Sequence, residues 1–224
     1  NGQIDLKETE PNLDIILSAK NLETSSFFGD KGFKGKINLD TYFKGKTSNI
    51  DAKAYVYWNE IFYKDQSINS GEINLSFSNN TIFIEKGNAN FLNSKILFLG
   101  NMNLENYRYV LDLSGVDLDL SELKGMEVRG IANIKLESEG ELKNFDLTEF
   151  CKSDFNIQAS VTSGEYSGIP FKSLYVLANG QNGLTNVEKI TVSLLNDGYI
   201  NADGVIKNNV LDLDLIGSQI DLST

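Results

Sequence analysis

Histidine is absent from this sequence of 224 residues, which also contains only one cysteine and two prolines. Without histidine, the chain can build neither a Ser-His-Asp nor a Cys-His catalytic arrangement, and it has no His-ligated metal centre. The lone cysteine, Cys151, excludes an internal disulfide and a cysteine-rich metal site. We therefore expect no enzyme activity, no cofactor and no bound metal.

Basic residues are also scarce. The chain has 20 Lys and Arg against 31 Asp and Glu, so its formal net charge is −11. Nucleic-acid binding requires clustered cations to neutralise phosphates, and this composition excludes it. No apolar run approaches the roughly 18 residues of a membrane-spanning helix. Since the chain begins with Asn1 rather than Met, we expect it to be a piece of a longer or processed protein.

What the sequence has in abundance is strict alternation of apolar and polar residues. Examples are Ile37 to Asp40, Ile73 to Phe77 and Val210 to Leu215. Because successive side chains of a strand point to opposite faces, a period of two predicts strands with one apolar and one polar face. Asn, Asp and Gly lie between the runs, which indicates tight hairpins. The best candidate for a short helix is 147–151.

An internal repeat of about a hundred residues is visible in these strands. The segments that begin at Leu13, Tyr109 and Leu211 are alike, and Leu17 and Leu113 correspond at 96 residues (113 − 17). Gly35 and Gly130 each open a similar strand, 95 residues apart (130 − 35). We divide the chain into the tail of a preceding repeat (1–32), repeat 1 (33–125) and repeat 2 (126–224), all within one continuous groove-like domain.

The fold class predicted from this pattern is all-β. A dozen or more antiparallel strands cannot remain one flat open sheet, because large sheets curl, split or fold over. We expect an elongated, repeat-built sheet folded into a groove, a β-taco, with a hydrophobic interior. The alternative is a closed sandwich in which the same apolar residues form a sealed core.

The sequence resembles the AsmA-like and TamB family of bacterial envelope proteins. The resemblance rests on the Gly-led strand openings at Gly35 and Gly130, on Gly100 and Gly204 before short apolar strands, and on two closings. The closings read VLDLSGVDLDLS from Val110 and VLDLDLIGSQIDLS from Val210.

The resemblance implies a segment of a periplasm-spanning, bridge-like protein in the envelope of a Gram-negative bacterium. Its hydrophobic groove would shield phospholipid acyl chains during transport from the inner to the outer membrane, and so serve envelope assembly. It further implies an inner-membrane anchor elsewhere in the full-length protein and an outer-membrane barrel assembly protein as a partner. Two alternatives stay open: an assembly factor for outer-membrane proteins that donates a strand, and a β-rich adhesive or binding module.

The residues expected to line the groove are the apolar members of the alternating runs. They are Ile37, Leu39, Ile73, Leu75, Phe77, Phe91, Leu97, Leu99, Met102, Leu111, Leu113, Ile134, Leu136, Phe155, Ile157, Leu174, Val176, Ile190, Val192, Leu194, Val205, Leu211, Leu213 and Leu215.

Two further groups admit a second interpretation. The aspartates that alternate with leucines, such as Asp112 and Asp212, could bind calcium, but they show neither an EF-hand loop nor a calcium-binding repeat, so a solvated strand face explains them better. The aromatic residues from Tyr55 to Tyr63 could bind sugar or lie at a membrane interface, but a packed pair of strands explains them equally well.

Overall fold

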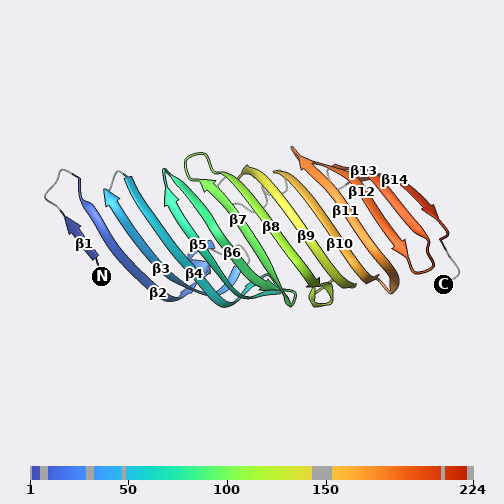
Figure 1. Cartoon of the computed structure of the whole chain (residues 1–224), viewed down its shortest axis with the longest axis horizontal. Helices are drawn as coiled ribbons and strands as arrows, with labels where there is room; N and C mark the ends of the chain where they lie inside the picture. Colours follow the sequence, from blue (N-terminus) through green and yellow to red (C-terminus); the bar gives the residue numbers. More distant parts are fainter. Residues whose placement is uncertain are drawn as a thin grey trace. The chain divides into compact units, whose positions relative to one another are not determined.

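The computed structural model describes residues 2–5, 10–28, 33–46, 49–142, 153–207 and 210–220. Fourteen antiparallel strands make one sheet whose order follows the sequence from β1 to β14 (Figure 1). β1 and β14 are the two ends of this order, so the sheet is not closed. The all-β antiparallel fold class predicted from the sequence is confirmed. The helix expected at 147–151 lies outside the described residues.

The chain divides into two compact units. Unit 1 comprises Asn1–Phe91 and Ile96–Tyr107, and unit 2 comprises Leu92–Lys95 and Arg108–Thr224. The division near residue 107 comes just before the second copy of the repeated closing strand, whereas the sequence period placed a repeat boundary at 125/126.

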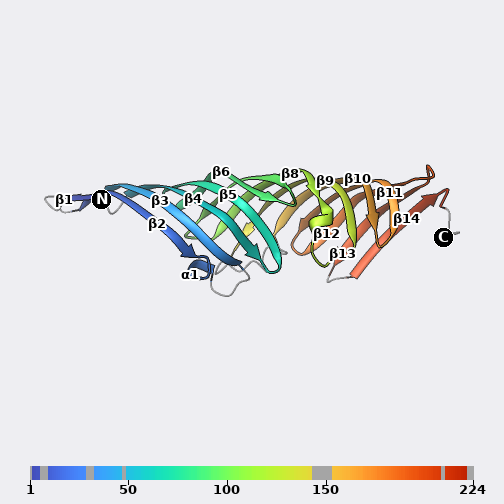
Figure 2. The same ribbon diagram turned by 90° about the horizontal axis from the view of Figure 1, so that it is seen from below.

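Each unit is a meander of long strands. The first seven strands are β1 (Gly2–Asp5), β2 (Asn12–Glu23), β3 (Phe33–Lys46), β4 (Asn49–Tyr63), β5 (Gln66–Ser78), β6 (Thr81–Phe91) and β7 (Ser94–Asn103). The next seven are β8 (Arg108–Asp119), β9 (Val128–Glu141), β10 (Asp154–Tyr166), β11 (Ile169–Gln181), β12 (Leu184–Leu194), β13 (Tyr199–Lys207) and β14 (Val210–Ser218). Helical structure in the described residues is limited to the short α1 (Ser25–Phe28) and a 3-10 turn, η1 (Leu120–Glu122) (Figure 2).

Tight turns connect most neighbouring strands, and they use the residues that tolerate positive φ. Asn79 and Asn80, with φ of 48° and 55°, connect β5 to β6, and Asn182 and Gly183 connect β11 to β12 in the same way. Two consecutive residues with positive φ match the right-handed twist of the flanking strands. Leu92 also adopts φ 49° before Asn93, although a leucine rarely does so.

Aromatic rings pack over glycines of neighbouring strands in this single sheet. The Trp58 ring lies over Gly71, the Phe98 ring over Gly87 and the Phe155 ring over Gly180. Trp58 also donates a hydrogen bond from Nε1 to the carbonyl of Asn69 at 2.8 Å, and only 6% of this residue is exposed. A glycine leaves room for a ring to lie flat across the neighbouring strand, so both are covered without a second sheet.

We predict that Gly87→Val lowers the free energy of unfolding by about 1–3 kcal/mol, the usual cost of overpacking. A Cβ at position 87 would collide with the Phe98 ring and force it off its site. Urea unfolding measures the change. Gly183→Ala is the control for a turn glycine, since nothing lies within 4 Å of its Cβ and its strain comes only from φ 76°. Equal effects on the two midpoints with no change in Phe98 packing would contradict the prediction.

Candidate functional site

Strand pairing places apolar side chains in rows on one face of unit 1. Residues directly opposite one another in an antiparallel pair point to the same side, so the register identifies each row. The rows are Phe43–Ala52–Phe77–Ile82, Thr41–Ala54–Leu75–Ile84 and Leu39–Val56–Ile73–Gly87. They contain no charged residue. We call this surface the apolar face of unit 1.

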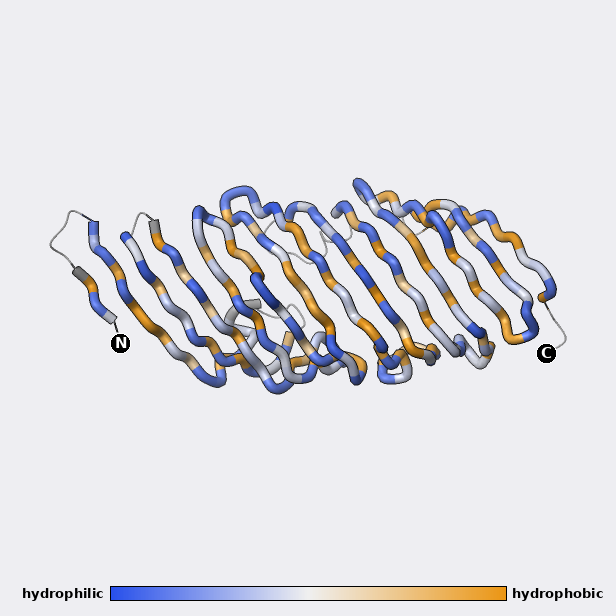
Figure 3. Tube along the Cα trace, in the orientation of Figure 1, coloured by the Kyte–Doolittle hydropathy of each residue, from blue (hydrophilic) through white to orange (hydrophobic). Residues whose placement is uncertain are grey.

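Unit 2 repeats the arrangement over seven strands, β8 to β14. The rows are Leu113–Leu136–Ile157–Ala178–Val187–Gly204–Leu213, Gly115–Ile134–Ala159–Val176–Ile190–Ala202–Leu215 and Leu118–Ala132–Val161–Leu174–Val192–Ile200–Gly217. Again no charged residue occurs in them. We call this surface the apolar face of unit 2. Figure 3 shows the alternation along the strands that produces both faces.

The opposite face of each unit is polar. In unit 2 one of its rows reads Asp112–Glu137–Asn156–Asn179–Asn186–Val205–Asp212. Lys135 and Glu137, two residues apart on β9, form an ion pair at 2.6 Å. The hydrogen bond to Glu137 and the charge of that carboxylate raise the pKa of Lys135. The two faces therefore differ in charge as well as in hydropathy.

Most residues that the sequence nominated as a groove lining lie on these two apolar faces, by strand pairing or by alternation with a paired neighbour. Met102 is placed by its alternation with Phe98, whose ring covers Gly87. On unit 1 they are Ile37, Leu39, Ile73, Leu75, Phe77, Phe91 and Met102. On unit 2 they are Leu111, Leu113, Ile134, Leu136, Phe155, Ile157, Leu174, Val176, Ile190, Val192, Leu194, Leu211, Leu213 and Leu215.

Three nominated residues lie on the polar face instead. Leu97 and Leu99 alternate with Phe98, whose ring covers Gly87 on the apolar face, and they are 47% and 49% exposed. Val205 pairs with Asn186 and with Asp212. The expectation that these three share the apolar face is wrong. In Ile96–Gly100 four apolar residues follow one another, so the sequence could not tell which alternate members face which side.

Other residues on the apolar faces were missed by the sequence analysis. On unit 1 they include Phe43, Val56, Ile82, Ile84 and Phe98, and on unit 2 Leu118, Val161, Val187, Ile200 and Ile206. Alternation already contained the signal for Phe43 and Val161, which lie an even number of residues from a nominated one, and Phe98 and Ile206 lie beside a wrongly chosen neighbour. Ile84, Leu118 and Val187 lie an odd number of residues from the nominated members of their strands, because a register shift intervenes. Only the pairing could identify them.

The aromatic cluster expected between Tyr55 and Tyr63 is divided between the faces. Tyr55 and Tyr57 lie on the polar face and stack with ring centroids 5.2 Å apart, whereas Trp58 is on the apolar face. The Tyr55 hydroxyl donates to Glu72 at 2.7 Å, and this bond to a carboxylate raises the pKa of Tyr55. The strand pair therefore explains the cluster without a ligand.

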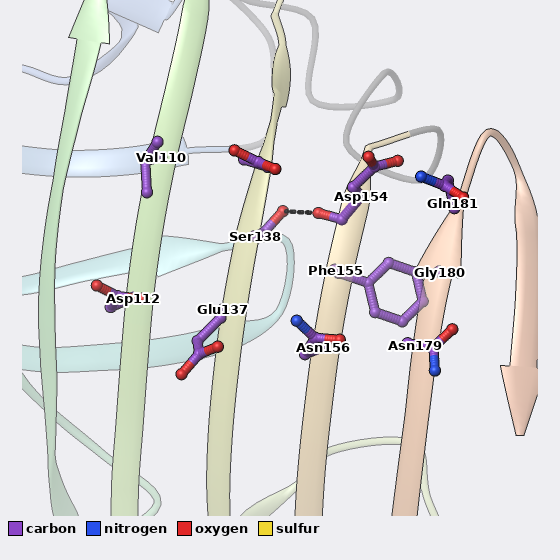
Figure 4. A pocket seen from close by; sticks show the side chains of 11 residues that line it. Val110, Asp112, Glu137, Ser138, Asp154, Phe155, Asn156, Asn179, Gly180 and Gln181 are labelled. Atoms are coloured by element: carbon purple, nitrogen blue, oxygen red, sulfur yellow. Dashed lines mark hydrogen bonds between the residues drawn. The ribbon is translucent and has the colours of Figure 1, made fainter. Parts of the chain in front are cut away.

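Two shallow depressions involve the polar faces. In unit 1 a depression of about 670 Å³ is lined by residues that include Asp40, Lys53, Tyr55 and Glu85. In unit 2 one of about 450 Å³ lies over β8 to β11, where Asp112, Glu137, Asn156 and Asn179 come from successive strands (Figure 4). Within the described ranges no group of three or more acidic, His or Cys side chains is placed to hold a metal ion.

The aspartates that were considered as calcium ligands lie in other environments. Asp112, Asp212 and Asp214 lie on the polar face of unit 2. Asp119 caps η1, because its carboxylate accepts from the Ser121 amide at 3.0 Å and from the Ser121 hydroxyl at 2.6 Å. Among the described helices, none has the length and hydropathy to span a membrane.

Searches against family models, curated proteins and solved structures find no match to this chain. The resemblance to AsmA-like and TamB proteins therefore stays a prediction.

We predict that Glu72→Gln lowers the pKa of Tyr55. Deprotonating Tyr55 breaks its hydrogen bond to Glu72 and places two negative charges together. A neutral amide at position 72 can still accept the hydrogen bond but removes the charge repulsion, so the Tyr55 pKa falls. NMR titration with ring-labelled tyrosine measures it, and Tyr55→Phe assigns the resonance. An unchanged or higher Tyr55 pKa in Glu72→Gln would show that the carboxylate is not the cause.

Proposed function

We propose that this chain is a segment of a bridge-like protein that shields phospholipid acyl chains on its apolar sheet faces during transport between the inner and outer membranes. The observation that carries the proposal is the set of apolar rows, which in unit 2 cross seven strands without a charged residue. In the described part of the chain these rows belong to a single sheet with no second sheet over it.

The physical reason is the cost of leaving such a surface in water. Each methylene removed from water contributes about 0.8 kcal/mol, so a fully covered sixteen-carbon tail gains on the order of 12 kcal/mol. That gain is similar to what the tail has in a bilayer, so the net free energy of transfer between the two is small. A surface of this kind supports movement of lipid along it rather than permanent binding. A polar head group can stay in water beside the sheet.

A catalytic residue is not needed for this function. The polar faces contribute solubility, since they carry most of the charged side chains that alternate with the apolar rows. The proposed envelope location, the inner-membrane anchor in the full-length protein and the barrel partner all follow from the resemblance described above and belong to the same proposal.

The first test is lipid retention by a matched pair of double variants. Leu113→Asp with Ile157→Asp adds two charges to the apolar face of unit 2, while Ser114→Asp with Asn156→Asp adds the same charge to the polar face of the same strands. We expect mass spectrometry of organic extracts to find phospholipid with the unaltered chain and with the polar-face variant. The apolar-face variant should lose at least tenfold, because a charge in contact with acyl chains is costly.

Circular dichroism of both variants provides the folding control. If the apolar-face variant unfolds while the polar-face variant does not, Leu113 and Ile157 form a sealed core of protein, and the lipid proposal fails. Extracts that are free of phospholipid for every folded chain would also overturn it.

The second test uses Trp58, the only tryptophan of the chain, as a reporter on the apolar face of unit 1. Phospholipid with brominated acyl chains is expected to quench Trp58 fluorescence, since bromine quenches at short range without direct contact and therefore reaches a ring that is only 6% exposed. The control variant, Tyr55→Trp with Trp58→Phe, moves the tryptophan to the polar face. Quenching of the control as strong as that of Trp58 would mean that lipid does not select the apolar face.

A further inference from the structure

The repeat is reproduced in atomic detail where a closing strand meets the strand that follows it. β2 pairs with β3 so that Leu17 faces Thr41, six residues after Gly35. β8 pairs with β9 so that Leu113 faces Leu136, six residues after Gly130. In both pairs the register shifts at the same step, between Ala19 and Leu22 in β2 and between Gly115 and Leu118 in β8.

A specific hydrogen bond fixes this step. Asn21 and Asp117, each four residues after the repeated leucine, have φ of 58° and 56°. The amide of Asn21 donates to Oδ1 of Asn38 at 3.1 Å, and the amide of Asp117 donates to Oδ1 of Asn133 at 2.9 Å. Both asparagines come three residues after the glycine that opens the strand. The incoming strand therefore has the pattern Gly-x-x-Asn, and a second glycine follows at Gly45 and Gly140.

β14 is the third copy of the closing strand, and the residues at its end adopt the same local conformation as in the other copies. Gln219, four residues after Leu215, has φ of 54°. The Ile220 side chain folds back over Gly217, just as Leu118 folds back over Gly115. The copies differ in solvent exposure: Leu118 of β8 is 5% exposed, whereas Ile220 and Leu215 of the third copy are 42% and 69% exposed. In the described chain β14 is the last strand of the sheet.

From this juxtaposition we propose that the edge of β14 is a docking site for an antiparallel strand of the β3 type. In this pairing the asparagine of the Gly-x-x-Asn pattern would accept a hydrogen bond from the Gln219 amide through its side-chain carbonyl. The residue six positions after the glycine would face Leu215. This proposal does not depend on lipid binding.

Charge complementarity specifies the partner strand further. Asp212 of β14 corresponds to Asp14 of β2, three residues before the repeated leucine, and Asp14 faces Lys44. In β8 the corresponding residue is Val110, which faces Glu139. Opposite charges on facing positions stabilise a strand pair and like charges destabilise it. A β3-like strand with a lysine nine residues after its glycine therefore fits β14 better than a β9-like strand.

The edge itself is built to accept such a strand. Natural edge strands are commonly protected by charged side chains, above all lysine, by proline or by a very short length. β14 spans nine residues and contains no lysine or proline; its two charged residues, Asp212 and Asp214, both lie on the polar face. It exposes Val210, Leu211, Leu215 and Ile216. An added strand would cover Leu215 and Ile220 on the apolar face and pair the outer backbone groups of β14.

The test is position-specific disulfide formation with a synthetic peptide of residues 33–46. The protein variants carry Leu215→Cys or Ile216→Cys in a Cys151→Ser background, and the peptides carry Thr41→Cys or Asp40→Cys. By analogy with Leu17–Thr41 and Ser18–Asp40, we expect the 215–41 and 216–40 combinations to form disulfides. The 215–40 and 216–41 combinations should not, because their side chains point to opposite faces.

Two altered peptides examine the recognition pattern. Lys44→Glu should reduce the yield of the 215–41 link by up to about fivefold, the ratio that corresponds to a facing charge pair. Asn38→Leu should reduce it as well, because the Gln219 amide loses its acceptor. Linking that is independent of position or of sequence would overturn the proposal, and so would the absence of any link. Protein chains that link only to each other through position 215 would show that the edge takes a second copy, which also overturns it.

Discussion

The pairing register is the constraint on which everything else in this sheet depends. A strand alternates its side chains between two faces, but two faces of different character arise only when neighbouring strands keep the same parity. In unit 2 the rows that contain Leu113, Gly115 and Leu118 stay apolar through seven strands despite register shifts in four of the strand pairs. At each shift one strand contributes an extra residue to the pair. The side chains beyond the extra residue again lie on the same face as the residues opposite them, so the apolar rows continue past the shift.

Glycine and aromatic residues together explain how a single layer holds so many apolar side chains. Where Trp58, Phe98 and Phe155 cross a facing glycine, the ring replaces the second layer that a sandwich would supply. Elsewhere in the rows, the buried residues Ala132, Ala178 and Ala202 each lie between larger apolar residues of the two flanking strands. This packing orders the apolar faces while leaving most of their residues partly accessible to a ligand.

The fold was predictable from the sequence because its signal is local: period-two alternation identifies strands, and Asn or Gly at the turns joins them as hairpins. The repeated leucines and glycines even imply the common register of β2–β3 and β8–β9, since their spacing is the same in both copies. Faces were less predictable where alternation is ambiguous. Leu97 and Leu99 lie in an unbroken apolar run, and only the position of the Phe98 ring over Gly87 decides their side. Val205 and Ile206 are adjacent and both apolar, so a choice between them requires the pairing of β13.

The register shift at Asn21 and Asp117 also bears on how such a chain can change in length. A single residue inserted elsewhere in a strand would move every later side chain of that strand to the opposite face. Apolar side chains would then face water, and charged side chains would lie on the apolar face. Whole hairpins can be gained or lost without that penalty, because each one returns the chain with its parity intact. A chain of this kind should therefore lengthen by duplicating pairs of strands, with small insertions confined to the turns between them.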